Sequence, residues 1–231
     1  MNLELFIARR IAHNGSGNRP GVMVRIAVVA VALSVTVMIL ALAVIMGFKR
    51  EITDRVTGFS AQVEVADLRS AGSIESVPVL RSEQLERTIR SAGEVVRLTP
   101  YAVKGGVVKM PDAILGVMLK GVDGGYEWSF FRDHLLEGEL PRVGDSIRTK
   151  EILISRSVAQ EMGLAPGDKV EMLFVESEKS PRRDRFKVSG IYATGMDEFD
   201  RSVAMTDLRN VQRLADWSSD EVSGYEVTLA D

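Results

Sequence analysis

The segment that decides the fold is Gly47–Val65, GFKREITDRVTGFSAQVEV, because its pattern changes from helical to strand-like within a few residues. Four apolar residues recur at helical spacing in its first part: Phe48, Ile52, Val56 and Phe59. From Ala61 the apolar period falls to two, as in a half-buried strand. Gly58 stands between the two patterns and is expected to end the helix. The segment therefore predicts a helix that leads directly into a sheet.

The residues before this segment explain why a helix begins there. Ile26–Met46, IAVVAVALSVTVMILALAVIM, contains 21 residues and no charged side chain. At about 1.5 Å per residue such a helix spans roughly 31 Å, the thickness of the hydrocarbon core of a bilayer. A buried core helix is the alternative, but core helices of this length are seldom apolar on every face. We predict a transmembrane helix over residues 26–46 and a stalk helix over residues 47–60.

A cleaved signal peptide is a second alternative, because Ala41-Leu42-Ala43 imitates a cleavage site. Against it, the polar lead of 25 residues is long and the apolar run continues beyond the site. We predict an uncleaved span with residues 1–25 as a cytoplasmic amphipathic segment on the membrane surface. Four arginines before the span and three basic residues after it slightly favour a cytoplasmic N-terminus.

Composition excludes several classes of function. The 231 residues carry a net charge of −3 and include no cysteine, which excludes disulfides, thiolate catalysis and thiolate metal sites. His13 and His134 lie far apart in the sequence and do not favour a histidine triad or metal site. There is no Gly-Lys dipeptide and so no P-loop for ATP. Nothing indicates an enzyme, a cofactor or a nucleic-acid partner.

The rest of the chain alternates strand and helix signals. A helix is expected from Ser82 to about Gly93, and a strand over residues 62–68. Further strands are expected over residues 94–103, 106–110 and 113–122, with turns at Gly105-Gly106 and Pro111-Asp112. Near the end we expect a strand over residues 203–206, a helix capped by Thr206, and a strand over residues 224–229.

The middle of the chain, residues 126–200, has a stronger strand character and contains the polar stretch VESEKSPRRDR, residues 175–185, as the loop of a hairpin. Its aromatic residues Trp128, Phe130 and Phe131 are interpreted as core rather than as a partner surface. We predict an α+β domain over residues 61–231, in which parts 61–122 and 203–231 flank an inserted, mostly β subdomain over residues 126–200.

These segments resemble a known family. The apolar span with GFKREITDRVTGFSAQVEV resembles the first transmembrane helix and stalk of FtsX-like permeases of ABC transporters, especially the LolC/LolE lipoprotein-releasing branch. The stretches ILISRSVAQEMGLAPGDKVEML and FKVSGIYATGMDEFDRSVAMTDLRNVQRL resemble its MacB-type periplasmic core domain.

The resemblance implies a permease of the bacterial inner membrane with its N-terminus inside and a periplasmic domain of two parts. The Porter part corresponds to residues 61–122 and 203–231, and the Sabre part to residues 126–200. It also implies a dimer with a second copy or paralogue, and a separate ATPase subunit whose ATP hydrolysis moves the periplasmic domains to expel cargo. Family members have three more transmembrane helices after this domain, so we expect the sequence to be the N-terminal portion of such a permease.

In LolC-like members a hairpin extends into a hook that grips a periplasmic lipoprotein chaperone. The corresponding hairpin here is short and lacks an apolar tip, which leaves lipoprotein cargo open. The candidate partner-binding residues of this loop are Glu176, Glu178, Lys179, Arg182, Arg183 and Arg185. A solvated turn without a partner is the alternative for the loop. A single-span, membrane-anchored periplasmic binding or scaffold protein without transport activity is the alternative for the chain.

Overall fold

A computed structural model describes residues 3, 4, 6, 7, 21–70, 76–110, 113–144, 148–176 and 179–230. The chain divides into two compact units, Met1–Asp54 and Arg55–Asp231, which are described separately. Most of the predicted cytoplasmic segment, residues 1–25, lies outside the described residues.

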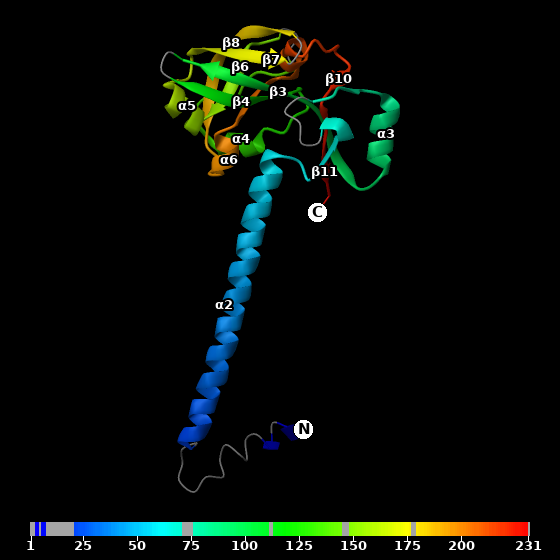
Figure 1. Ribbon diagram of the computed structural model, residues 1–231. Helices are drawn as coiled ribbons and strands as arrows, with labels where there is room; N and C mark the ends of the chain where they lie inside the picture. The colour runs from blue at the N-terminus through cyan, green and yellow to red at the C-terminus, as the bar shows by residue number, and fades with distance from the viewer. Residues whose placement is uncertain are drawn as a thin grey trace. The chain divides into compact units, whose positions relative to one another are not determined.

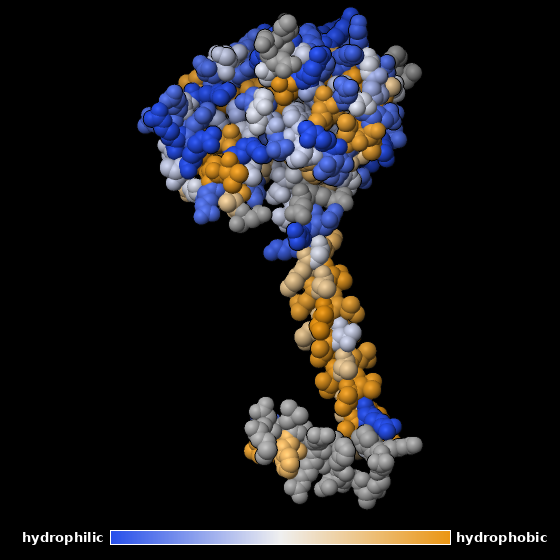
Figure 2. Space-filling view, turned by 180° about the vertical axis from the view of Figure 1, so that it is seen from behind, coloured by the Kyte–Doolittle hydropathy of each residue, from blue (hydrophilic) through white to orange (hydrophobic). Residues whose placement is uncertain are grey.

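Helix α2 runs without interruption over Val22–Phe59 (Figure 1). It is long and apolar enough to cross a membrane, and apolar side chains cover most of the surface between its charged ends (Figure 2). The hydroxyls of Ser34 and Thr36 donate to backbone carbonyls one turn earlier, so these polar groups are satisfied within the helix. One helix therefore contains both the predicted span and the predicted stalk, and the boundary between them stays a prediction.

The helix ends one residue beyond the predicted stop, and Gly58 is not its cap. Gly58 lies within α2, which ends at Phe59, and Gly58 is not among the glycines with positive φ. A Cβ atom at Gly58 would lie 2.3 Å from the ring of Phe130. The glycine is therefore needed for close packing and not for a left-handed turn.

The second unit is the predicted α+β domain. Its described residues form a nine-stranded mixed sheet in the order β1-β11-β3-β4-β9-β6-β8-β5, while β7 pairs with β3 and β8. Its strands are β1 (Val63–Ala66), β3 (Val95–Lys109), β4 (Ile114–Val122), β5 (Leu135–Gly138), β6 (Glu151–Ser155), β7 (Lys169–Glu176), β8 (Lys179–Tyr192), β9 (Val203–Asp207) and β11 (Gly224–Leu229). The short strands β2 (Val79–Leu80) and β10 (Glu221–Val222) form a second sheet.

Helices pack on this sheet and at its edges (Figure 1). They are η1 (Leu68–Ser70), α3 (Glu83–Ser91), α4 (Ser129–Asp133), α5 (Arg156–Met162), α6 (Asp197–Asp200) and α7 (Leu208–Leu214). The predicted start of α3 is confirmed, because the Ser82 hydroxyl accepts from the Leu85 N–H at 3.1 Å. The predicted cap at Thr206 is wrong: Thr206 is a buried residue of β9 whose hydroxyl donates to the carbonyl of Glu151, and Asp207 caps α7 instead.

The predicted turn at Gly105-Gly106 is also wrong, because β3 continues through both glycines. They pair with Met118 and Val117 in the ladder with β4. A Cβ atom at Gly106 would lie 2.6 Å from the ring of Phe174, so the glycine makes room for a neighbouring side chain inside a strand.

The charged stretch 175–185 is mostly strand rather than loop. β8 begins at Lys179, which pairs with Glu176 of β7, and Arg182 pairs with Phe174. Because side chains alternate along a strand, Arg182 and Arg183 lie on opposite faces. The residues between the two strands, 177 and 178, lie outside the described residues.

The division of the domain into two parts stays a prediction. Strands from the predicted flanking parts, β1, β11, β3, β4 and β9, are contiguous at one end of the sheet. The β6, β8 and β5 strands of the predicted middle part follow at the other end. The β6–β9 and β3–β7 pairings join both groups in one sheet.

A hydrophobic core lies on each face of the sheet, as the alternation along β4 illustrates. Leu119 belongs to the larger cluster, into which α5 and α7 also contribute side chains. Val122 belongs to the smaller cluster, together with Phe59 at the end of α2, Phe131 of α4 and Phe199 of α6. The last turn of α2 is therefore part of the core on this second face.

Candidate functional site

The end of α2 packs into the domain through an aromatic cluster. Phe59 is 5% exposed, and its ring centroid lies 4.6 Å from that of Phe199 and 5.8 Å from that of Phe131. Beside it, the missing side chain of Gly58 lets the helix backbone approach Phe130. We call these contacts of Gly58 and Phe59 the helix seat. All of them lie within the second compact unit.

Part of the sheet face next to the helix seat is polar. In the ladder, Glu64 of β1 lies opposite Glu226 of β11, which lies opposite Thr99 of β3. Tyr101 of β3 and Lys120 of β4 point to the same face, because directly paired residues and alternate residues of a strand share a side. Five residues from four strands are thus brought together by strand register.

Lys120 is the centre of this polar group. It is 6% exposed, and its Nζ lies 2.5 Å from Oε1 of Glu226. The same Nζ lies 5.7–5.8 Å from the ring centroids of Phe59, Tyr101 and Tyr126. These distances fall within the range of cation–π attraction. Lys120 therefore connects strand β4 with β11 and with the end of α2.

The carboxylates around Lys120 perturb each other and their neighbours. The Tyr101 hydroxyl donates to Oε1 of Glu64. Burial and the neighbouring Glu226 raise the pKa of Glu64, while the positive charge of Lys120 acts in the opposite direction. Burial and Glu226 also raise the pKa of the Tyr126 phenol. The polar group thus contains two carboxyl groups and one ammonium group.

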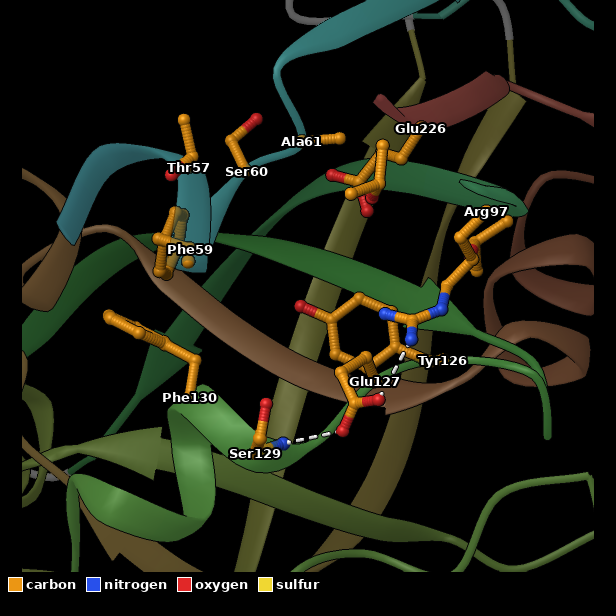
Figure 3. A pocket seen from close by; sticks show the side chains of 13 residues that line it. Thr57, Phe59, Ser60, Ala61, Arg97, Tyr126, Glu127, Ser129, Phe130 and Glu226 are labelled. Atoms are coloured by element: carbon orange, nitrogen blue, oxygen red, sulfur yellow. Dashed lines mark hydrogen bonds and ion pairs between the residues drawn. The ribbon is translucent and has the colours of Figure 1, made fainter. Parts of the chain in front are cut away.

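A cavity of about 200 Å³ adjoins the helix seat (Figure 3). Its lining residues are Thr57, Gly58, Phe59, Ser60, Ala61, Arg97, Thr99, Tyr126, Glu127, Ser129, Phe130, Glu226 and Thr228. Within it, Arg97 forms an ion pair with Glu127 at 3.0 Å, and the Ser129 N–H donates to the same carboxylate at 3.1 Å. Phe59 therefore packs on aromatic rings on one side and lines a half-open pocket on another.

The groups of this region contact Phe59 in the last turn of α2. Among the described residues no group of three or more His, Cys, Asp or Glu side chains could hold a metal ion. Burial and the nearby Glu226 raise the pKa of the Tyr126 phenol, so this hydroxyl stays protonated at neutral pH. What the arrangement does provide is a buried ammonium group and an aromatic cluster that hold the last turn of α2.

The predicted stalk residues differ in their surroundings. Phe48 and Ile52 are exposed on α2, at 68% and 47%, and Phe59 is buried in the domain. The side chain of Val56 lies outside the described residues. Of the aromatic residues interpreted as core, Phe131 is fully buried, while Trp128 and Phe130 are half-buried.

Of the predicted partner-binding residues, the three described arginines of β8 lie on two faces of the strand. Arg182 pairs with Asp216 at 2.6 Å, whereas Arg183 and Arg185 both approach Glu171, at 3.7 and 3.1 Å. Glu178 and the side chains of Glu176 and Lys179 lie outside the described residues. A partner contact by any of these six residues stays a prediction.

Sequence reasoning missed Lys120 and Glu226. The available signal was a charged residue inside each of two otherwise strand-like segments, ILGVMLKGV and GYEVTL. Charges at alternate positions of a strand usually mark its solvated face. In the fold, Phe59 at the end of α2 and the rings of Tyr101 and Tyr126 lie around the Lys120 ammonium, and both charged residues are buried.

The chain resembles membrane components of lipoprotein-releasing systems. It is 27% identical over 199 residues to the "Lipoprotein-releasing system transmembrane protein LolC" of Xylella fastidiosa, covering 82% of this chain and 45% of that protein. It is 22% identical over 247 residues to the corresponding protein LolE of Haemophilus influenzae, covering 100% of this chain and 56% of that protein. The chain thus spans about half the length of these relatives.

Two solved structures are similar at a lower level. The extracellular domain of the noncanonical ABC-type transporter YknZ from Gram-positive bacteria has 14% identity and a TM-score of 0.45, covering 73% of this chain and 81% of that one. The periplasmic region of MacB from Actinobacillus actinomycetemcomitans has 14% identity and a TM-score of 0.46, and the match covers 73% of this chain and 72% of that one. The family match extends further: residues 26–231 match the MacB-like periplasmic core domain family, and the chain belongs to that family.

Proposed function

We propose that this chain is the N-terminal part of a permease subunit of an ABC transporter of the lipoprotein-releasing type. In this proposal α2 crosses the bacterial inner membrane, the N-terminus is cytoplasmic and the second unit is periplasmic. The family match and the LolC and LolE relatives support it. The length and apolar surface of α2 agree with a membrane span.

One observation carries the mechanism: α2 is a single uninterrupted helix whose last turn belongs to the folded domain. A hydrogen-bonded helix resists bending, so a displacement at one end is passed to the other. In the proposed cycle a separate ATPase subunit moves the membrane part of a permease dimer. Through α2 and the helix seat this motion reaches the periplasmic domain, which expels cargo from the outer leaflet. The partner subunit is a second copy or a paralogue.

The experiment breaks α2 between its ends in the full-length permease, produced in cells together with its ATPase. In Ile52→Pro the helix loses a hydrogen bond and gains a clash, at a cost of about 3 kcal/mol or more. Ile52 is 47% exposed and lies outside the domain unit, so domain folding is spared. Ile52→Ala is the matched control, because it also removes the isoleucine side chain but alanine is compatible with a continuous helix.

We expect Ile52→Pro to lose release of lipoprotein from spheroplasts while ATP hydrolysis continues, and Ile52→Ala to retain both. Residues 1–231 contain no cysteine, so Ser91→Cys added to each variant, with any cysteine elsewhere in the full-length permease replaced by serine, reports insertion when it reacts with a membrane-impermeant maleimide from the periplasmic side. Wild-type release by a correctly inserted Ile52→Pro protein would refute mechanical coupling through α2. Failure of Ser91→Cys to react from that side would refute the proposed orientation.

A further inference from the structure

A buried ammonium group at the helix seat is not explained by the needs of the fold. Lys120 is 6% exposed and follows the buried Leu119 in β4. An isolated ammonium group is unfavourable in a protein interior, and an apolar residue of similar volume is often at least as stabilising as a buried ion pair. The charge at this position therefore calls for a role other than stability of the sheet.

The groups that face this ammonium come from five different segments. Glu226 of β11 accepts its hydrogen bond, and Glu64 of β1 adds a second negative charge. Tyr101 of β3 and Tyr126 of the loop before α4 present rings. The remaining ring is Phe59, the one contribution from α2.

Two features make the position of Phe59 depend on this ammonium. Apolar burial by itself gives the Phe59 ring no preferred direction, and its tilted pairs with Phe131 and Phe199 orient it in part. Attraction between a fixed cation and the ring quadrupole does have a direction. The cavity beside Phe59 also leaves room for the last turn of α2 to shift if that attraction is lost.

We propose that Lys120 is a positioning residue that holds the end of α2 in the helix seat, with Glu226 fixing its ammonium beside the Phe59 ring. Breaking this pair releases the last turn of α2 into the adjoining cavity. The role of the seat in coupling rests on the proposed transport function. The seating itself is a property of the chain and can be measured without transport.

The test measures how open the helix seat is. Because the chain has no native cysteine, one introduced thiol is the only one that reacts. Thr99→Cys is the reporter, since Thr99 is 4% exposed and lines the cavity at the helix seat. Ala159→Cys is the control, since Ala159 is 5% exposed in the core on the other face of the sheet. Labelling rates with a membrane-impermeant maleimide are measured on the full chain in membranes.

Lys120→Met keeps the length of the side chain and removes its charge. The double variant Lys120→Met/Glu226→Gln also removes the carboxylate that would otherwise be left buried without its partner. We expect both to raise labelling of Thr99→Cys about tenfold, as loss of a desolvated cation–π contact implies, with labelling of Ala159→Cys unchanged. Phe59→Leu should give a similar increase, and adding Lys120→Met to it should have little further effect.

Two results would overturn the proposal. A wild-type labelling rate of Thr99→Cys in the double variant would mean that the ammonium does not hold the helix end. Equal increases at Thr99→Cys and Ala159→Cys would mean that Lys120 supports the whole domain rather than the seat. Neither result depends on cargo release, so both are separable from a failure of the proposed function.

Discussion

Adding one methyl group at the helix seat tests the close packing of α2 on the domain. In Gly58→Ala the new Cβ would lie 2.3, 2.8 and 2.9 Å from three carbon atoms of the Phe130 ring. Carbon atoms in contact are about 3.5–4.0 Å apart, so the ring or the helix has to move by about 1 Å. The ring is not free to move without loss, because it packs edge-on against Phe131 at 5.5 Å and lies 4.4 Å from the ring of His134.

Two opposing effects set the change in the free energy of unfolding caused by Gly58→Ala. Replacing glycine by alanine inside a helix contributes about 1 kcal/mol of stability. Overpacking of this kind costs about 1–3 kcal/mol. We therefore expect Gly58→Ala to lower the free energy of unfolding of the domain by up to about 2 kcal/mol. At about 2–4 °C per kcal/mol for a domain of this size, the melting temperature falls by a few degrees.

The assay is thermal unfolding of the purified full chain in detergent, followed by the fluorescence of Trp128, which lies 5.8 Å from Phe131 in the same cluster, and of Trp217. In a Phe130→Ala background the clash is absent, so Gly58→Ala should become stabilising. Gly47→Ala is the control on the same helix, because a Cβ there meets nothing within 4 Å. If Gly58→Ala destabilises the domain equally with and without the Phe130 ring, the packing argument is refuted.

Three further predictions concern other residues of the domain. Gly106→Ala should destabilise the domain by about 1–3 kcal/mol in thermal unfolding, because its Cβ meets the Phe174 ring at 2.6 Å, whereas Gly116→Ala, with nothing within 4 Å, should not. Burial raises the pKa of Glu64 above 4.5, so its stabilising contribution is complete below pH 4.5 and is lost as the pH rises through the higher folded-state pKa. Glu64→Gln should remove this part of the pH dependence of the melting temperature, and an unchanged profile would contradict it. The side chain of Arg183 is 73% exposed. Arg183→Glu should therefore lower crosslinking to a periplasmic partner without altering the melting temperature. Unchanged crosslinking would exclude Arg183 as a contact.

Local patterns in the sequence were sufficient for the elements whose stability is local. The run from Ile26 to Met46 predicts a bilayer-length helix because its length and lack of charge belong to one continuous segment. The start of α3 follows from Ser82, whose hydroxyl caps the helix three residues later. The same reasoning predicts the strands at residues 203–207 and 224–229 within a residue of their observed bounds.

The predictions failed where the conformation of a residue depends on contacts with residues distant in the sequence. Gly105-Gly106 and Gly58 have the composition of a turn and of a helix stop, but Gly106 makes room for Phe174 and Gly58 for Phe130. The charged stretch 175–185 has the composition of a loop, yet most of it is strand because β7 supplies a continuous hydrogen-bonding partner. The type of a residue limits the backbone conformations that it can adopt. Contacts with residues distant in the sequence select one of these conformations.

The sequence by itself determined the apolar span, the α+β character of the domain and the resemblance to the family, because each depends on order along the chain. The contacts that form the helix seat became known only from the tertiary structure. Glu64, Lys120 and Glu226 come from three strands, and their proximity depends on register and strand order rather than on sequence spacing. Burial of the Lys120 charge is decided by Phe59 and the strands around it, and so it becomes visible only when these segments are in place.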